Sequence, residues 1–333
     1  MTVQTALPVR HGSGVGEARR AAQRLAERAG LPAARAAAVA LLATELAANL
    51  ARHAREGELL LRALAPPGGP AVELLSVDRG PGMADVERCL ADGYSTAGTP
   101  GTGLGAVRRI ARDFDIWSQP GWGTLVLARV GRDARPAPAE RFDWGCVSLP
   151  AARESVCGDG WALQQRDGEV TLMVADGLGH GPLAAEASDA ACRVFAEDPL
   201  PEPADFLERA HRSLGSTRGA AIGAARGSAS ALRLRFAGVG NVAGAVVGPD
   251  SQHGLASHNG TVGAQLPRVQ AFDYDWPDRA LLVLHSDGLR TRWNLRDYPG
   301  LHARHPALVA AALYRDFRRP NDDVTVLVAR AAA

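Results

Sequence analysis

The sequence predicts an α+β protein of two domains, and three observations support this. Two long Ala-rich helical stretches precede a few short strands near the N-terminus. A polar, Pro- and Ala-rich segment at 131–139 then interrupts the pattern. Short apolar strands follow, several with an aspartate at one end. With 333 residues the chain can build two cores. We therefore expect domains at 1–130 and 140–333, joined by a linker at 131–139.

Composition limits the function classes. Hydrophobic residues make up 46% and charged residues 22%, as in soluble globular proteins, and the net charge of +1 argues against nucleic-acid or anionic-membrane binding. The four cysteines form no C-x-x-C pair, which favours a reduced, cytoplasmic protein. Residues 1–10 lack an apolar signal core, and no stretch approaches the ~20 apolar residues of a membrane span.

The elements of the first domain follow from periodicity and from turn residues. Ala-rich sequences are good helix formers, and two early helices over a small sheet make one α+β layer. We expect helices at 14–29, 32–55, 84–91 and 104–113, strands at 58–64, 71–77, 114–118 and 123–130, and a small-residue loop at 93–103.

Several polar positions of this domain belong together. Glu45, Asn49 and His53 are spaced by four residues, so they project from one helix face, which alone is typical of a solvated surface. Asp78 ends an apolar strand and is followed by Gly80 and Gly82. The glycine-rich loop then leads into a helix, where backbone N–H groups and the helix dipole favour an anion. The helix face, the acid and the loop occur together in one small domain, which favours a ligand site over a plain solvated surface.

The boxes Glu-x-x-x-Asn, Asp-x-Gly-x-Gly and Gly-Thr-Gly-Leu-Gly, over about residues 15–130, resemble those of the GHKL superfamily, specifically the RsbT-like anti-sigma-factor serine kinases. The resemblance implies a GHKL-type α/β sandwich that binds ATP with Mg²⁺. Asn49 would coordinate Mg²⁺, Glu45 would position or deprotonate the attacking hydroxyl, and Asp78 would accept a hydrogen bond from the adenine amino group. Gly82 would allow close approach, and His53 is expected to be structural. The remaining cofactor-binding positions implied are Gly80, Thr102, Gly103, Leu104 and Gly105.

In the second domain, four aspartates lie at strand ends. The apolar runs 171–175 and 281–285 each end at an Asp-Gly turn, at Asp176 and Asp287, while Asp323 opens the run 324–328 and Asp159 follows a glycine. Any one Asp-Gly pair is typical of a plain turn. Four acids without His or Cys partners favour Mg²⁺ or Mn²⁺ over zinc. Helices are expected at 182–196, 203–214 and 306–316.

The elements Gly-Asp, Asp-Gly-x-Gly-x-Gly, Ser-Asp-Gly and Asp-Asp-x-Thr, in this order over about residues 140–330, resemble the SpoIIE-type branch of the metal-dependent protein phosphatases, closest to the short RsbX-like members. The resemblance implies a PPM-type α/β/β/α sandwich with two Mn²⁺ or Mg²⁺ ions. Asp176 would bridge the ions and the Gly177 carbonyl would complete one site. Asp287 and Asp323 would hold the second ion, with Asp159 on the side of the first. His180 is expected to be an exposed turn residue.

A kinase-like domain and a phosphatase domain in one chain imply a partner switch that acts on a phosphorylated STAS-domain antagonist in a sigma-factor network. A phosphoserine carries a charge of about −1.5 to −2, which disrupts a packed interface. Three alternatives stay open at this point. The chain is a phosphatase with an ATP-binding domain in cis, a bifunctional kinase and phosphatase, or an ATP-sensing module that binds a sigma-factor regulator.

Overall fold

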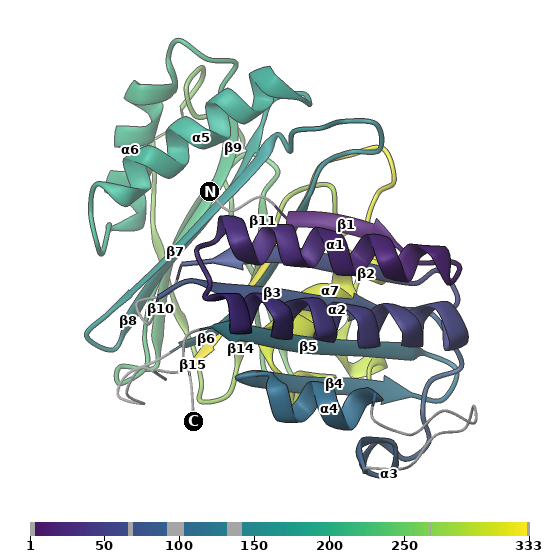
Figure 1. The fold of residues 1–333 in the computed structure, drawn as a ribbon. Helices are drawn as coiled ribbons and strands as arrows, with labels where there is room; N and C mark the ends of the chain where they lie inside the picture. The colour runs from purple at the N-terminus through teal and green to yellow at the C-terminus, as the bar shows by residue number, and fades with distance from the viewer. Residues whose placement is uncertain (1–3, 66–68, 92–102, 132–141, 267, 332–333) are drawn as a thin grey trace. The chain divides into compact units, whose positions relative to one another are not determined.

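The computed structural model describes residues 4–65, 69–91, 103–131, 142–266 and 268–331. The chain forms two compact units, residues 2–137 and 138–333, each of which has its own sheets and helices (Figure 1). Each unit is described separately below.

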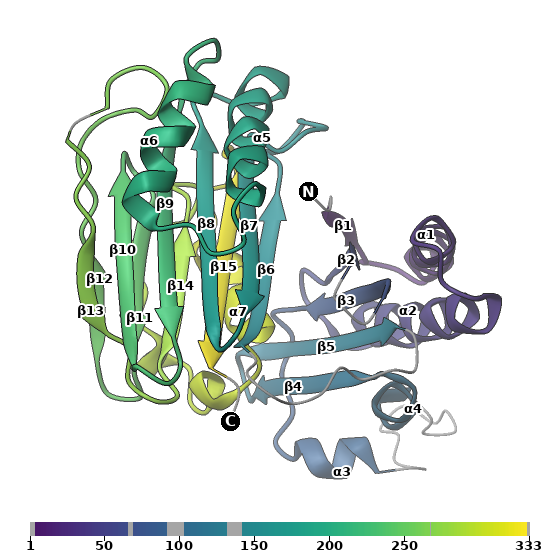
Figure 2. The same ribbon diagram turned by 90° about the vertical axis from the view of Figure 1, so that its left-hand side faces the viewer.

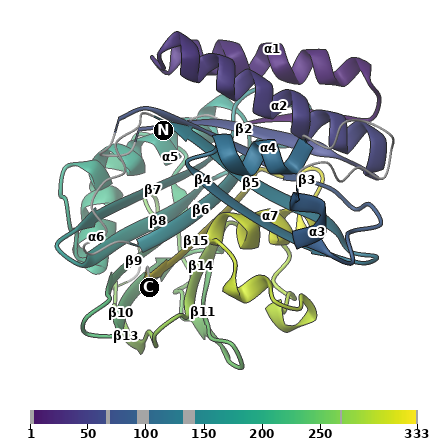
Figure 3. The ribbon, with the colours of Figure 1, turned by 60° about the horizontal axis from the view of Figure 1, so that its bottom comes forward.

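The N-terminal unit is one five-stranded sheet with helices on one face (Figure 3). The strand order is β1-β2-β3-β5-β4, and each neighbouring pair is antiparallel. The strands are β1 (Gln4–Pro8), β2 (Glu58–Leu64), β3 (Ala71–Val77), β4 (Asp113–Gln119) and β5 (Gly123–Gly131). The helices are α1 (Ser13–Arg28), α2 (Ala33–His53), α3 (Val86–Leu90) and α4 (Gly103–Ile110).

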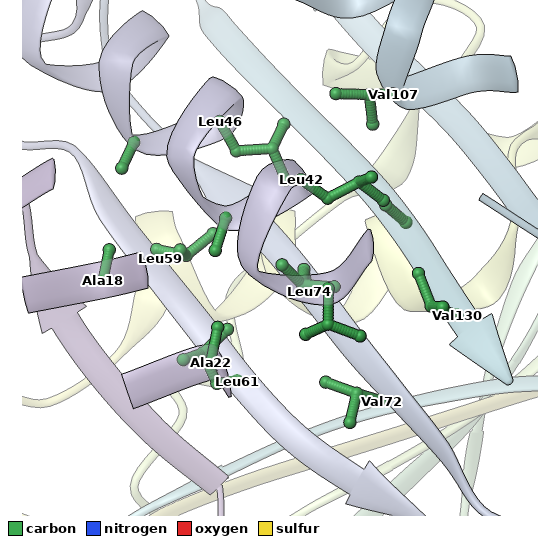
Figure 4. Close-up of a cluster of buried hydrophobic side chains, with 14 of the residues drawn as sticks. Ala18, Ala22, Leu42, Leu46, Leu59, Leu61, Val72, Leu74, Val107 and Val130 are labelled. Atoms are coloured by element: carbon green, nitrogen blue, oxygen red, sulfur yellow. The ribbon is translucent and has the colours of Figure 1, made fainter. Parts of the chain in front are cut away.

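The core of this unit lies between the helices and the sheet (Figure 4). Ala18 and Ala22 of α1 are fully buried one turn apart, and their small side chains let α1 pack closely on α2. Leu42 and Leu46 of α2 meet alternate residues of the strands, such as Leu59. In the described chain, α2 is also the one helix long and apolar enough to span a membrane. Its buried residues, such as Leu42, Leu46 and Leu50, pack in this core.

The predicted elements of the first domain are present, with three differences. Strand β1 was not predicted; it is short, ends on a proline and pairs at the sheet edge, where a proline is tolerated. The helix expected at 104–113 ends at Ile110, because Asp113 already pairs with Arg129 in the sheet. The helix expected at 84–91 covers only Val86–Leu90 and begins at the side-chain cap Asp85. The loop expected at 93–103 lies, apart from Gly103, outside the described residues.

The C-terminal unit contains two five-stranded sheets with orders β13-β10-β9-β8-β7 and β12-β11-β14-β15-β6. The first comprises β7 (Asp159–Arg166), β8 (Glu169–Gly177), β9 (Ala220–Ser228), β10 (Arg233–Val239) and β13 (Phe272–Asp275). The second comprises β6 (Phe142–Leu149), β11 (Ala243–Val247), β12 (Gln252–Leu255), β14 (Leu281–His285) and β15 (Val324–Ala331). The helices are α5 (Pro182–Ala196), α6 (Pro203–Leu214) and α7 (Pro306–Phe317), with short 3-10 turns at Leu295–Asp297 and Leu301–Ala303.

The two sheets pack face to face, and helices cover their outer faces. Residues from both sheets, such as Leu172 of β8 and Leu327 of β15, share one core. Helices α5 and α6 cover the outer face of the first sheet (Figure 2). Helix α7 lies on the second so closely that a Cβ at Gly145 would stand 2.1 Å from the Ala307 Cα. The expected α/β/β/α sandwich is thus confirmed.

One local expectation was wrong. Asp176 and Gly177 are not a turn after the strand but its last two residues, because β8 continues to Gly177. Asp176 pairs with Asp159 on one side and Ala221 on the other. Its side chain therefore takes its direction from the sheet.

Candidate functional site

The predicted aspartates of the second domain meet at one end of the sandwich. Asp159 opens β7 and lies directly opposite Asp176 at the end of β8. In the other sheet, β14 and β15 pair antiparallel with His285 opposite Val326. Antiparallel pairing therefore brings Asp287, just after β14, and Asp323, just before β15, to the same edge.

Two contacts connect the sheets at this edge. The Ser286 hydroxyl donates a 2.6 Å hydrogen bond to Asp159 Oδ2, and its oxygen accepts from the Thr325 N–H at 3.0 Å. Asp323 Oδ2 accepts from the Gly158 N–H at 2.9 Å. A Cβ at Gly158 would stand 2.6 Å from this carboxylate oxygen, so the approach needs glycine. These contacts position Asp159 and Asp323 across the gap between the sheets.

Further hydrogen bonds orient Asp323 and Asp287. Asp323 Oδ1 accepts from the Ala151 N–H at 2.7 Å. Asp287 accepts a hydrogen bond from the Asn241 side-chain amide. Asn241 follows Gly240, whose φ of +92° turns the chain between β10 and β11. Asp322 is half-buried and interacts with Asp287.

The electrostatics are those of crowded carboxylates. Burial and the nearby charges of Asp159 and Asp287 raise the pKa of Asp176 to about 9. Burial, opposed by the Ser286 hydrogen bond, raises the pKa of Asp159 to about 7. Burial also raises the pKa of Asp322 and of Asp323. Like charges held close in a partly dry site favour either protons or a bound cation.

The donor set suits hard divalent cations, because it offers carboxylate oxygens at one edge without a Cys ligand. Within the described residues, no three acidic, His or Cys side chains already converge as a complete metal cage. Asp159, Asp287 and Asp323 each accept a hydrogen bond that restricts the orientation of the carboxylate. Because an ionised carboxylate has about four lone-pair sites, these bonds leave ligand capacity for a cation.

The predicted nucleotide-binding residues of the first domain also lie together. Glu45 and Asn49 project from α2 toward the start of α4. A Cβ built on Gly103 would be 3.6 Å from Glu45 Oε2 and 3.7 Å from Asn49 Oδ1. The N–H groups at the start of a helix are suited to an anion. Leu104 is half-buried against the core and Gly105 is buried, while Thr102 lies outside the described residues.

Asp78 and its glycines form a tight structural turn. Asp78 Oδ1 accepts from the Gly80 N–H at 2.5 Å. A Cβ at Gly80 would stand 2.7 Å from the carbonyl oxygen of His53, where α2 ends. Gly82 has a φ of +71°, and a Cβ there would stand 1.9 Å from the Gln119 carbonyl oxygen. The close approach at Gly82 is thus made, in this structure, to the hairpin of β4 and β5.

Two features of the second domain had no assigned role in the sequence. Ser286 belongs to the Ser-Asp-Gly element and Asn241 follows Gly240, yet nothing local in the sequence indicates that they bond to Asp159 and Asp287. His180 is exposed, as expected, and its Nδ1 lies 2.7 Å from Glu154 Oε1. The sequence signal for Ser286 was that it directly precedes Asp287, a predicted metal ligand.

Comparison with known proteins supports both halves. The family model described as histidine kinase-like ATPase domain matches residues 11–130, and that of stage II sporulation protein E (SpoIIE) matches residues 166–332. The chain is 31% identical to the serine/threonine-protein kinase RsbT of Bacillus subtilis (strain 168). The aligned region is 111 residues long and covers 33% of this chain and 84% of RsbT.

The second half has its own relatives. It is 26% identical to the phosphoserine phosphatase RsbX of Bacillus subtilis (strain 168) over 138 residues, 41% of this chain and 69% of RsbX. A crystal structure of RsbX in complex with magnesium superposes with a TM-score of 0.50 at 21% identity, covering 58% of this chain and 96% of that one, which shows the shared fold. The chain therefore belongs to the SpoIIE family, with a serine/threonine phosphatase unit that follows an RsbT-like histidine kinase-like ATPase domain.

Proposed function

We propose that this chain is a divalent-metal-dependent phosphoserine or phosphothreonine phosphatase that acts in the cytoplasm on a phosphorylated STAS-domain protein in a partner-switching pathway. The observation that carries the proposal is that Asp159, Asp176, Asp287 and Asp323 all lie at one end of the sandwich. The similarity to RsbX supports the choice of a phosphoserine substrate.

Asp176 would hold both Mn²⁺ or Mg²⁺ ions, with the Gly177 carbonyl on one of them. Asp287 and Asp323 would hold the second ion, and Asp159 would lie on the side of the first. Bound ions supply Lewis-acid polarisation of the phosphoryl oxygens and activation of a water molecule. The chain's own contribution is to fix these carboxylates by Ser286, Asn241 and backbone N–H groups, so that little reorganisation accompanies the reaction.

We propose that the N-terminal unit binds ATP with Mg²⁺. Asn49 would hold the ion, Asp78 would accept from the adenine amino group, and the start of α4 at Gly103 would face the phosphates. The placement of Glu45 and Asn49 beside Gly103 supports this arrangement. It also favours a second candidate function, phosphoryl transfer to a STAS serine with Glu45 positioning the hydroxyl.

The phosphatase is tested by the Asp176→Asn variant, assayed with Mn²⁺ on p-nitrophenyl phosphate and on a serine-phosphorylated STAS protein. Removing the charge of a ligand shared by two ions is expected to lower turnover by at least about 100-fold. Asp167→Asn is the matched control, since Asp167 is an exposed residue of the turn at the far end of the same β7–β8 hairpin. Wild-type turnover in Asp176→Asn would contradict the two-metal site.

The kinase is tested in the Asp176→Asn background, where dephosphorylation is removed. Transfer of labelled phosphate from ATP to the STAS serine, abolished by Glu45→Ala, would establish a bifunctional switch. Nucleotide binding without transfer would leave a phosphatase that an ATP-binding domain regulates.

A further inference from the structure

Three exposed large apolar residues flank the carboxylate edge of the second unit, by which we mean the end of the sandwich where Asp159, Asp176, Asp287 and Asp323 lie. Val156, Leu178 and Leu183 are 40%, 42% and 51% exposed, and they are three of the six large hydrophobic residues exposed in the described chain. Single exposed apolar residues are ordinary on a protein surface. A concentration of them at one site is typical of an interaction surface.

Local contacts fix these residues around the aspartates. Val156 lies three residues before Asp159, and Leu178 directly follows Gly177. Ala184, the neighbour of Leu183, packs under the site, since a Cβ at Gly177 would stand 2.1 Å from the Ala184 carbonyl oxygen. The start of α5 is therefore part of the same edge.

The loops that carry the three side chains are also joined to one another. Glu154, in the loop of Val156, contacts His180 at 2.7 Å in the loop between β8 and α5. The Leu178 N–H donates to the Gly219 carbonyl at 3.0 Å, which brings in the segment before β9. A Cβ on Gly179 would be 3.0 Å from Arg218 Nη1, so an exposed guanidinium lies beside the apolar group. The backbone segments that carry the three apolar side chains are thus connected to one another.

We propose that Val156, Leu178 and Leu183 form a docking surface for the substrate protein, which presents a phosphoserine with apolar side chains on both sides. This inference rests on the proposed phosphatase function. A phosphoserine that reaches the carboxylate edge brings the residues before and after it in the substrate against these loops. Apolar substrate residues at those positions would bury Val156, Leu178 and Leu183 from water. Arg218 adds a cation that attracts the phosphorylated segment toward an otherwise acidic site.

The test uses two phosphoserine heptapeptides of equal charge, one with leucines and the other with serines on both sides of the phosphoserine. The measured quantity is the ratio of their kcat/KM values with Mn²⁺ in each variant, which cancels differences in the amount of active enzyme. Wild type is expected to favour the leucine peptide by at least about tenfold, which is the lower end of the range for covering two half-exposed leucines. Leu178→Ser with Leu183→Ser is expected to bring the ratio near one, and Leu183→Ser alone to reduce it partly.

Leu232→Ser is the matched control. Leu232 is 47% exposed but lies in the turn between β9 and β10, at the opposite end of the sheet from Gly177. Its ratio is expected to equal that of wild type. A wild-type ratio near one, or a double variant that keeps the wild-type preference, would overturn the docking surface. Absence of p-nitrophenyl phosphate hydrolysis by wild type would instead overturn the proposed function, and the docking surface with it.

Discussion

Replacing Ser286 by alanine should weaken metal binding in addition to destabilising the fold. Ser286 is fully buried, and its hydroxyl makes two contacts: it donates to Asp159 Oδ2 at 2.6 Å and accepts from the Thr325 N–H at 3.0 Å. Ser286→Ala leaves both partners without this oxygen. The bond to Asp159 joins the two sheets at the carboxylate edge, so its loss frees the direction of a proposed metal ligand.

Two magnitudes follow from these contacts. An orphaned buried N–H costs about 1–3 kcal/mol of unfolding free energy. For a unit of this size ~2 kcal/mol corresponds to a fall in Tm of about 4–8 °C. Loss of a hydrogen bond that orients a metal ligand typically weakens metal affinity by about 10–100-fold. The Mn²⁺ concentration for half-maximal p-nitrophenyl phosphate hydrolysis should rise by that factor, and activity should return at high Mn²⁺.

Ser148→Ala is the matched control. Ser148 is buried on the strand beside β15 and contacts the Thr325 hydroxyl at 2.9 Å, and the Thr325 side chain in turn bonds to Asp159. Ser148→Ala therefore acts on Asp159 only through Thr325, and it should lower Tm while raising the Mn²⁺ requirement less than Ser286→Ala does. If Ser286→Ala kept the wild-type half-saturation while its Tm fell, the hydroxyl would be a packing residue only and the positioning argument would be refuted.

Three further predictions concern ligands and pH. Chelation of divalent ions should lower the Tm of the phosphatase unit. A cation that binds only the folded state stabilises that state by ~2.7 kcal/mol when its free concentration is 100 times its Kd. Identical melting curves with EDTA and with Mn²⁺ would contradict this. Asp78→Asn should weaken ADP binding by about tenfold in calorimetry, because a carboxylate acceptor becomes an amide, and unchanged affinity would exclude Asp78 as the adenine contact. Burial raises the pKa of Glu73, but the charges of Arg62 and Arg129 outweigh it, so the pKa lies below 4.5. The stability that Glu73 adds is therefore fully present above the pKa of the unfolded state and is lost as pH falls through the lower pKa of the folded state. The free energy of unfolding should differ between wild type and Glu73→Gln by ~3–5 kcal/mol at neutral pH, and this difference should shrink in acid. A difference that does not change with pH would count against the charge-pair argument.

The sequence by itself determined the classes of both units, and it named the residues that we propose carry their chemistry. Helical periodicity and Ala content predict α1 and α2 within two residues of their ends, because an amphipathic helix is encoded by neighbours three and four positions apart. The order of the motifs around Asp78, Asp176 and Asp323 identifies the two halves, since each motif is a short local segment.

What only the tertiary structure decided depends on residues far apart in the chain. Ser286 and Asp159 are separated by 127 positions, and no local pattern encodes their hydrogen bond. Strand β6 pairs with β15 from the other end of the unit, which sets the second sheet and places Asp323 at its edge. Asp176 lies within the last two residues of a strand instead of beginning a turn, because β7 pairs with Asp176 and β9 pairs with both Asp176 and Gly177. Long-range pairing is selected by the packing of whole sheets, so it becomes visible only when the sandwich has formed.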